Sequence, residues 1–302
     1  MNKAKTGYAA IFGLPNAGKS TLLNALLGQK LSIITAKPQT TRKRLLGILN
    51  EESYQLIFLD TPGILSPAYL LQQKMMDEVK TSLNDADVIV LIIDVSEDAI
   101  GEKLLNQEFV KQAVLASKKP KLLILNKVDF ITQEKVVQLI KHFEKQKLFE
   151  EVIPVSASLN FNIQRVLVEI LRFLPEGPKL FPNDQLTDAS ERFFVTELIR
   201  EKILELYRDE VPYSCEVLIA EYKERDTSKD FISAEVVVEK DSQKVIIIGK
   251  GGAAIKKLGM VARESIEEFL QREVFLELRV KVRKKWRSDE NMLKSFGYSK
   301  KE

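Results

Sequence analysis

The chain has 302 residues, which is enough for about two domains. Hydrophobic residues make up 45% and charged residues 29%, a soluble globular balance, and no apolar run reaches membrane-spanning length. The single cysteine, Cys215, excludes an intrachain disulfide and, with no signal sequence at the N-terminus, predicts a cytoplasmic location.

Charge is unevenly distributed along the chain. The net charge is only +3, but residues 249–302 hold 14 Lys and Arg against 8 Asp and Glu. This basic end favours a polyanionic partner. The alternative is a solvated charged face.

Apolar segments bounded by turn residues alternate with helical patterns over the first 174 residues. This alternation predicts a doubly wound α/β domain with a parallel sheet, and a ligand site at the carboxyl ends of its strands. The predicted strands are 7–12, 45–50, 54–60, 88–94, 121–126 and 151–155, and the predicted helices are 19–27, 71–83, 102–116, 133–148 and 163–173.

The sequence Gly13-Leu-Pro-Asn-Ala-Gly-Lys-Ser20 is a phosphate-binding loop, G-x-x-x-x-G-K-S, between the first strand and the first helix. Its glycines let consecutive N–H groups converge on phosphate oxygens, and the following helix adds its positive end. Lys19 is expected to contact the β- and γ-phosphates, and Ser20 to bind Mg²⁺. The other expected nucleotide-binding residues here are Gly13, Asn16, Ala17, Gly18 and Thr21.

Two further segments are expected to respond to the γ-phosphate. The basic, pattern-free stretch 35–44 is predicted to be a switch loop, in which Thr41, or else Thr40, completes the Mg²⁺ shell. The sequence Asp60-Thr-Pro-Gly63 follows a predicted strand. Asp60 can hold Mg²⁺ through a water, and the N–H of Gly63 can meet the γ-phosphate, so that this loop orders with the triphosphate.

Two later motifs select the base. In Asn126-Lys-Val-Asp129, the Asp129 carboxylate can accept hydrogen bonds from N1–H and the N2 amine of guanine, which adenine cannot supply. Asn126 would support the loop, and the stem of Lys127 would cover the base or sugar. In Ser156-Ala157-Ser158, the N–H of Ala157 can donate to guanine O6. The phosphate-binding loop followed by these two motifs, in this order, predicts binding of GTP and GDP.

The proline-rich segment after residue 174 is predicted to connect two domains, with boundaries 1–174, 175–190 (linker) and 191–302. Beyond it we expect a helix at 193–207, strands at 213–222 and 231–239, a helix at 253–270 and a strand at 274–281, with a weakly patterned tail from 286. With the G-x-x-G sequence Gly249–Gly252, this order fits an α+β KH domain, a single-stranded RNA-binding fold. Four β-branched residues at 245–248 favour a strand, whereas the type II KH order favours a short helix, which we expect.

Several residues of this domain are expected to bind RNA. The glycines Gly249, Gly251 and Gly252 would let the RNA backbone approach, and Lys250, Lys256 and Lys257 would contact phosphate. Ile247 and Ile255 can support bases; the alternative, that the isoleucines are core residues, applies most to Ile246. Arg283, Lys284 and Lys285 surround Trp286, which either stacks on a base or anchors the tail.

The particular residues of these motifs indicate one family of GTPases. Gly13–Ser20, Gln39-Thr-Thr-Arg42, Asp60–Ile64 and the KH domain resemble the Era family of bacterial ribosome-assembly GTPases over essentially the whole chain. The resemblance implies binding of the 3′ end of 16S rRNA and a role in 16S rRNA processing and small ribosomal subunit biogenesis. It also implies peripheral association with the inner face of the cell membrane as an alternative location.

The resemblance has two catalytic implications. Ile64 stands where many GTPases carry a water-orienting glutamine, so intrinsic hydrolysis should be slow. Asn16 stands where related enzymes help to coordinate K⁺; the alternative is that it only stabilises the loop. The catalytic residues expected are therefore Lys19, Thr41, Asp60 and Gly63 together with Asn16.

Two functions stay open: a GTPase that couples hydrolysis to subunit maturation, and a GTP-gated RNA-binding checkpoint or chaperone with negligible turnover. A tRNA-modifying or membrane-signalling GTPase is a weaker third. We expect a monomer that does not bind DNA.

Overall fold

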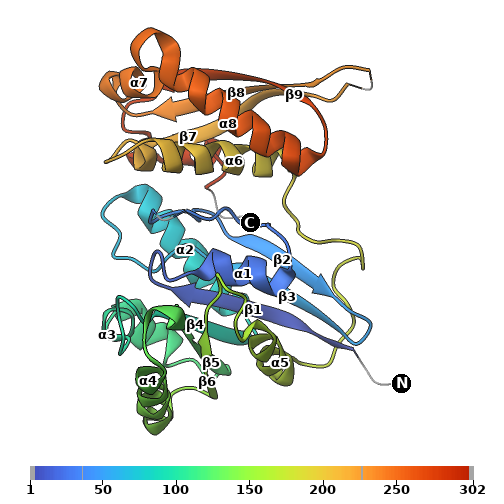
Figure 1. The fold of residues 1–302 in the computed structure, drawn as a ribbon, viewed down its shortest axis with the longest axis vertical. Helices are drawn as coiled ribbons and strands as arrows, with labels where there is room; N and C mark the ends of the chain where they lie inside the picture. Colours follow the sequence, from blue (N-terminus) through green and yellow to red (C-terminus); the bar gives the residue numbers. More distant parts are fainter. Residues whose placement is uncertain (1–3, 36, 226, 299–302) are drawn as a thin grey trace. The chain divides into compact units, whose positions relative to one another are not determined.

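The computed structural model describes residues 4–35, 37–225 and 227–298. Within them the chain forms two compact units, one from residues 4–67 and 75–188 and one from residues 68–74 and 189–298. Figure 1 shows the elements of each unit. Among these residues, no helix combines the length and the hydropathy needed to cross a bilayer.

The first unit is built on a sheet of six described strands in the order β2-β3-β1-β4-β5-β6. Each neighbouring pair is parallel except β2 and β3, which are antiparallel. The prediction of a parallel sheet was therefore wrong at this edge, because residues 51–53 are too few for a parallel crossover. The strands are β1 Lys5–Gly13, β2 Leu45–Asn50, β3 Tyr54–Asp60, β4 Val88–Asp94, β5 Lys121–Asn126 and β6 Glu151–Val155.

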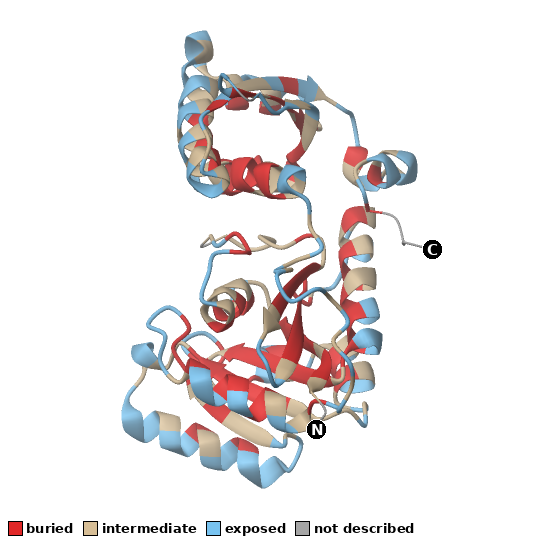
Figure 2. Cartoon of the chain, turned by 90° about the vertical axis from the view of Figure 1, so that its right-hand side faces the viewer, coloured by how far each residue is buried: buried red, intermediate tan, exposed pale blue. Residues whose placement is uncertain are grey.

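Helices cover both faces of this sheet. Alternate residues of β1, such as Ala9 and Ile11, face α1 (Lys19–Leu27) and α5 (Ile163–Phe173). The residues between them, such as Ala10 and Phe12, face α2 (Leu70–Asp85), α3 (Glu102–Leu105) and α4 (Gln133–Gln146). Figure 2 shows the resulting buried sheet between exposed outer helix faces. The carboxyl ends of the five parallel strands therefore lie at one edge of the sheet.

The predicted helix 102–116 was wrong as a single element. The structure has the short α3 followed by a π-helical turn, Val110–Val114. Leu104 and Val110 are both buried, yet a six-residue separation would place them on different faces of one straight α-helix. The break lets both side chains reach the core.

The segment after α5 runs along the first unit. The N–H groups of Leu180 and Phe181 donate to Gln55 Oε1 at 2.7 and 2.9 Å, and the N–H of Ile48 donates to the carbonyl of Leu186 at 2.8 Å. Gln55 is fully buried. Much of the predicted linker is therefore held against β2 and β3.

The second unit has the helix, strand and loop order expected of a KH domain. Its sheet order is β7-β8-β9, with β7 antiparallel and β9 parallel to β8. The helices α6 and α8 bury Val195, Ile199 and Ile266 against it. The elements are α6 Glu191–Leu206, β7 Glu216–Lys223, β8 Asp230–Val238, α7 Asp241–Ile248, α8 Ala253–Leu270, β9 Val274–Val282 and α9 Glu290–Ser295.

The segment 245–248 is helical, as the domain order predicted against its β-branched composition. The side chain of Gln243 accepts hydrogen bonds from the N–H groups of Glu239 and Lys240, both at 2.9 Å, and so caps the first turn of α7. Gly249, with φ 72°, ends the helix. Capping and tertiary packing therefore outweigh the local strand preference.

Candidate functional site

The loop between β1 and α1 has the geometry of a phosphate cradle. Gly18 adopts a left-handed conformation, φ 96°, and the Asn126 side chain packs where a Cβ would stand. Any other residue at position 18 would meet both a backbone penalty and this side chain. The buried Lys19 ammonium donates to the carbonyls of Gly13 and Leu14 at 3.3 and 3.0 Å.

Burial lowers the pKa of Lys19 to about 8, although the nearby Asp60 carboxylate acts in the opposite direction. The ammonium is thus poorly solvated, with carbonyl dipoles as its hydrogen-bond partners. A phosphate anion entering the loop would place a negative charge next to this ammonium, in place of the neutral carbonyl groups.

Three residues predicted to hold Mg²⁺ converge below the loop. Ser20 Oγ lies 3.0 Å from both Thr41 Oγ1 and Asp60 Oδ2, and Thr41 Oγ1 donates to Asp60 Oδ2 at 3.2 Å. The other switch threonine lies apart from this cluster: Thr40 Oγ1 pairs with Thr35 Oγ1 at 3.1 Å and donates to the Lys37 carbonyl at 2.9 Å. The geometry favours Thr41 over Thr40.

The cluster fits a magnesium ion. Asp60 is fully buried, and its Oδ1 has no hydrogen-bond partner in the structure. Burial raises the pKa of Asp60, whereas Lys19 and the surrounding hydroxyls act to lower it. An orphaned carboxylate oxygen beside two hydroxyls is an oxygen donor set of the kind that Mg²⁺ takes, usually with waters and substrate phosphates.

Gly63 and Ile64 lie directly under the phosphate loop. A Cβ on Gly63 would stand 2.8 Å from the backbone nitrogen of Pro15, so no side chain fits there. The N–H of Ile64 donates to the Gly13 carbonyl at 3.0 Å, and its side chain is buried in the core. Ile64 cannot orient a water in the cleft from this position.

The three predicted motifs of the nucleotide site are physically linked through Asn126. Its Nδ2 donates to the Ala17 carbonyl at 2.9 Å, and its Oδ1 accepts from the Ala157 N–H at 3.1 Å. Guanine O6 would therefore have to share or replace the Asn126 acceptor at this N–H. Ser156 and Ser158 flank it, with their hydroxyl oxygens 3.4 Å apart.

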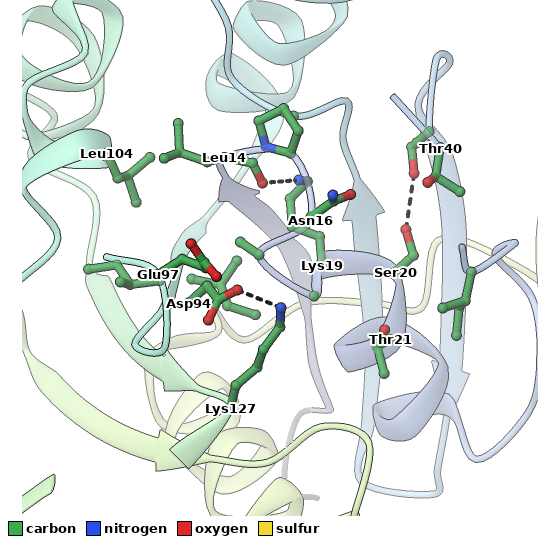
Figure 3. A pocket seen from close by; sticks show the side chains of 18 of the residues that line it. Leu14, Asn16, Lys19, Ser20, Thr21, Thr40, Asp94, Glu97, Leu104 and Lys127 are labelled. Carbon is green, nitrogen blue, oxygen red and sulfur yellow. Dashed lines mark hydrogen bonds and ion pairs between the residues drawn. The ribbon is translucent and has the colours of Figure 1, made fainter. Parts of the chain in front are cut away.

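Asp129 and Lys127 lie where the base is expected. Asp129 is exposed, on a single 3-10 turn, Val128–Phe130. Lys127 forms an ion pair with Asp94, which ends β4 (Figure 3). Asp94 was not predicted from the sequence; its position at the carboxyl end of a buried strand was the available signal.

Some of these residues line a cleft of about 720 Å³, a volume suited to a nucleotide. Figure 3 shows Lys19, Ser20 and Lys127 around it. Asp60, Asn126, Asp129 and residues 156–158 are not part of its lining. The predicted residues that line the cleft are Asn16, Ala17, Gly18, Lys19, Ser20, Thr21, Thr40, Thr41, Gly63 and Lys127.

In the second unit, the G-x-x-G loop forms a sharp exposed turn between α7 and α8. Gly249, Gly251 and Gly252 have φ values of 72°, 58° and 78°, and a Cβ on Gly249 would stand 2.6 Å from Ala254 Cβ. Lys250, on this turn, is exposed. The predicted cations Lys256 and Lys257 are exposed on the first turns of α8, beside the half-buried Ile255.

The basic segment 283–285 lies at the same end of the sheet as the start of α7. Val282 pairs with Val238, and the N–H of Arg283 donates to the Val238 carbonyl at 2.8 Å. Arg283, Lys284 and Lys285 are all exposed. The register therefore gathers these cations near the end of β8 that leads into α7.

The structure contradicts the predicted RNA contact of Ile247 and, for Trp286, favours the alternative that it anchors the tail. Ile247 is fully buried, and its carbonyl accepts from the Tyr207 hydroxyl at 2.9 Å; its neighbour Ile246 is the one exposed, at 50%. Trp286 is also fully buried, and its Nε1 donates to the Ser214 carbonyl at 2.9 Å. Neither side chain can meet a base, because each is fully buried.

The fold and the linked motifs define a P-loop GTPase joined to a KH domain. Family comparison agrees: residues 8–127 match the 50S ribosome-binding GTPase family and residues 210–287 match the KH domain family.

Comparison over the full length gives the family. GTPase Era of Clostridium botulinum (strain Eklund 17B / Type B) is 42% identical, with 98% of this chain and 99% of that protein covered. The chloroplastic GTPase ERA-like protein of Arabidopsis thaliana is 46% identical, with coverage of 97% and 69%. The chain belongs to the Era family of GTPases.

Two solved structures are similar throughout. A point variant of Aquifex aeolicus Era bound to GDP and AlF4⁻ superposes with a TM-score of 0.93 at 41% identity, over 98% of this chain and 99% of that one. A structure of Era with MgGDPNP and nucleotides 1506–1542 of 16S ribosomal RNA gives 0.93 at 42% identity, with the same coverage.

Proposed function

We propose that this protein is a GTP-hydrolysing switch that binds the 3′ end of 16S rRNA and acts in 16S rRNA processing and small ribosomal subunit biogenesis. The convergence of Ser20, Thr41 and Asp60 beneath the phosphate loop carries the proposal, since these three side chains offer oxygen donors for Mg²⁺ near Lys19, which is expected to contact the phosphates. The relative solved with MgGDPNP and a 16S rRNA fragment supports both halves.

The residues of the cleft would act as follows. Lys19 would contact the β- and γ-phosphate oxygens in place of its carbonyl partners, and Ser20, Thr41 and Asp60 would hold Mg²⁺. When bound, Mg²⁺ neutralises the charge that develops on the transferred phosphoryl group. Asp129 reads the guanine edge, and Asn126 keeps its loop against the phosphate loop.

GTP hydrolysis should be slow unless another group orients the attacking water or stabilises the developing charge. The buried Ile64 offers no polar group to the attacking water. We propose that K⁺ at Asn16, which lines the cleft with φ 64°, supplies part of the missing charge stabilisation. The hydrolysis rate should rise when K⁺ replaces Na⁺; an unchanged rate would leave Asn16 with a purely structural role.

Ile64 also favours the second candidate, a GTP-gated RNA-binding checkpoint whose turnover matters little. Multiple-turnover hydrolysis with and without the rRNA fragment distinguishes the two. Stimulation by RNA supports the coupled GTPase, whereas a negligible rate in both conditions supports the checkpoint.

Charge reversal tests the proposed RNA binding. Lys250→Glu should lower affinity for a 16S rRNA 3′-end oligonucleotide and reduce the salt dependence, because one phosphate contact is lost. Lys229→Glu makes the same charge change at the other end of β8, next to Asp230. Equal losses from both variants would argue for non-specific attraction, and GDP binding should be unchanged in both.

We propose further that the chain works as a cytoplasmic monomer without affinity for DNA, and that the cations 283–285 allow peripheral association with the inner face of the cell membrane. Sedimentation with anionic and neutral vesicles tests the membrane contact. Binding to neither vesicle would remove it.

A further inference from the structure

The loop that follows α1 is fixed at its start by one side chain. Asn24 Oδ1 accepts from the N–H groups of Leu31 and Ser32 at 3.0 and 2.9 Å, and its Nδ2 donates to the Ser32 carbonyl at 2.8 Å. Asn24 itself lies on α1, one helical turn after Ser20. The position of Ser32 is thereby tied to the same helix that carries the phosphate loop.

This attachment directs the Ser32 hydroxyl to the predicted metal site. Ser32 is 5% exposed, and its Oγ donates to Asp60 Oδ2 at 2.9 Å. Ser32 precedes the predicted switch loop 35–44, and no motif in the sequence marks it. The contact joins the start of the loop to the carboxylate at the end of β3.

Ser32 differs from the other two donors to Asp60. Ser20 and Thr41 also donate to Oδ2, at 3.0 and 3.2 Å, but both are expected to turn their oxygen lone pairs toward a cation. Their hydroxyl hydrogens must then reorient. The backbone of Ser32 is held by the Asn24 side chain, and Ser32 is not among the predicted metal ligands, so its hydroxyl can keep its hydrogen bond to Asp60 whether or not a cation is present.

We propose that Ser32, held by Asn24, is a positioning residue for the magnesium site: it fixes the rotamer of Asp60 so that the carboxylate meets the metal-bound water. This inference rests on the proposed function, since it assumes a magnesium-dependent nucleotide site. Groups that orient metal-binding carboxylates typically change metal affinity by about 10- to 100-fold.

The test is the dissociation rate of a fluorescent GDP analogue from the full chain as a function of free Mg²⁺. Ser32→Ala should raise the Mg²⁺ concentration for half-maximal slowing by about tenfold. Ser32→Thr keeps the hydroxyl and should resemble wild type, and Ser32→Cys, with a weaker donor, should fall between. The matched control is Ser82→Ala, which removes a buried hydroxyl that donates at 2.9 Å to the Glu78 carbonyl within α2.

The dissociation rate in EDTA separates positioning from general damage. A positioning role leaves this rate within about twofold of wild type in Ser32→Ala, because without metal the orientation of Asp60 has no effect on the nucleotide. The proposal would be overturned if Ser32→Ala released the GDP analogue faster by the same factor with and without Mg²⁺. It would also be overturned if the Mg²⁺ midpoint of Ser32→Ala did not differ from that of Ser82→Ala. If wild type shows no Mg²⁺ dependence, the proposed nucleotide site itself is wrong.

Discussion

Trp286 offers a direct choice between a base-stacking residue and a structural anchor. It is fully buried, donates from Nε1 to the Ser214 carbonyl at 2.9 Å, and packs on Phe296 with ring centroids 5.5 Å apart. Trp286→Phe removes the donor and leaves a buried carbonyl unpaired, at a cost of about 1–3 kcal/mol. Truncation to Ala adds a cavity and should cost about 3–5 kcal/mol.

The assay pairs thermal unfolding with RNA binding. Trp286→Phe should lower the melting midpoint of the second unit by at least about 4 °C, since 1 kcal/mol corresponds to roughly 4–8 °C in a domain of about this size. Measured well below that midpoint, its RNA affinity should stay within about twofold of wild type. The exposed neighbour gives the opposite control: Lys285→Ala should weaken RNA binding and leave the midpoint unchanged.

Fluorescence supplies a third reading, because Trp286 is the only tryptophan of the chain. Saturating RNA should leave its emission nearly unchanged. Strong quenching, together with lost RNA affinity and an unchanged midpoint in Trp286→Phe, would refute the anchor role and restore base stacking.

The remaining predictions concern the base, the phosphates and the packing of α7. Asp129→Asn should shift nucleotide preference from guanine toward xanthine in competition binding, and an unchanged preference for GTP would contradict the base-recognition role. Because burial lowers the pKa of Lys19 to about 8, GDP affinity should be flat below that pH and fall up to about tenfold per pH unit above it, with Lys19→Met flat over pH 7–9. Burial raises the pKa of Tyr207 to about 12, so its contribution to stability is complete below about pH 10 and is lost as the pH rises toward 12. Tyr207→Phe should remove this alkaline loss in chemical denaturation, and an unchanged pH profile would show that Tyr207 is not its source.

Much of the nucleotide site could be predicted because each motif is local and follows a buried strand. The parallel strands bring those loops to one edge whatever the details of packing. Ser32 and Asp94 were missed for the complementary reason: their contacts with Asp60 and Lys127, respectively, join residues far apart in the sequence and exist only in the folded chain.

The errors have physical causes as well. In four successive β-branched residues the sequence does not show which side chain faces inward, so Ile246 and Ile247 were assigned the wrong way round. A basic segment around an aromatic residue likewise leaves open whether the ring is exposed. The antiparallel pairing of β2 with β3, by contrast, could have been predicted, because only three residues, 51–53, join the two strands.

A GTP-controlled switch should bind RNA with different affinities in its two nucleotide states. The most direct measurement is the affinity of the full chain for a 16S rRNA 3′-end oligonucleotide, at fixed salt, with a non-hydrolysable GTP analogue and with GDP. We predict binding about tenfold tighter with the GTP analogue, within the usual range of coupling between two sites. Equal affinity in the two nucleotide states, at saturating nucleotide, would contradict a GTP-controlled switch.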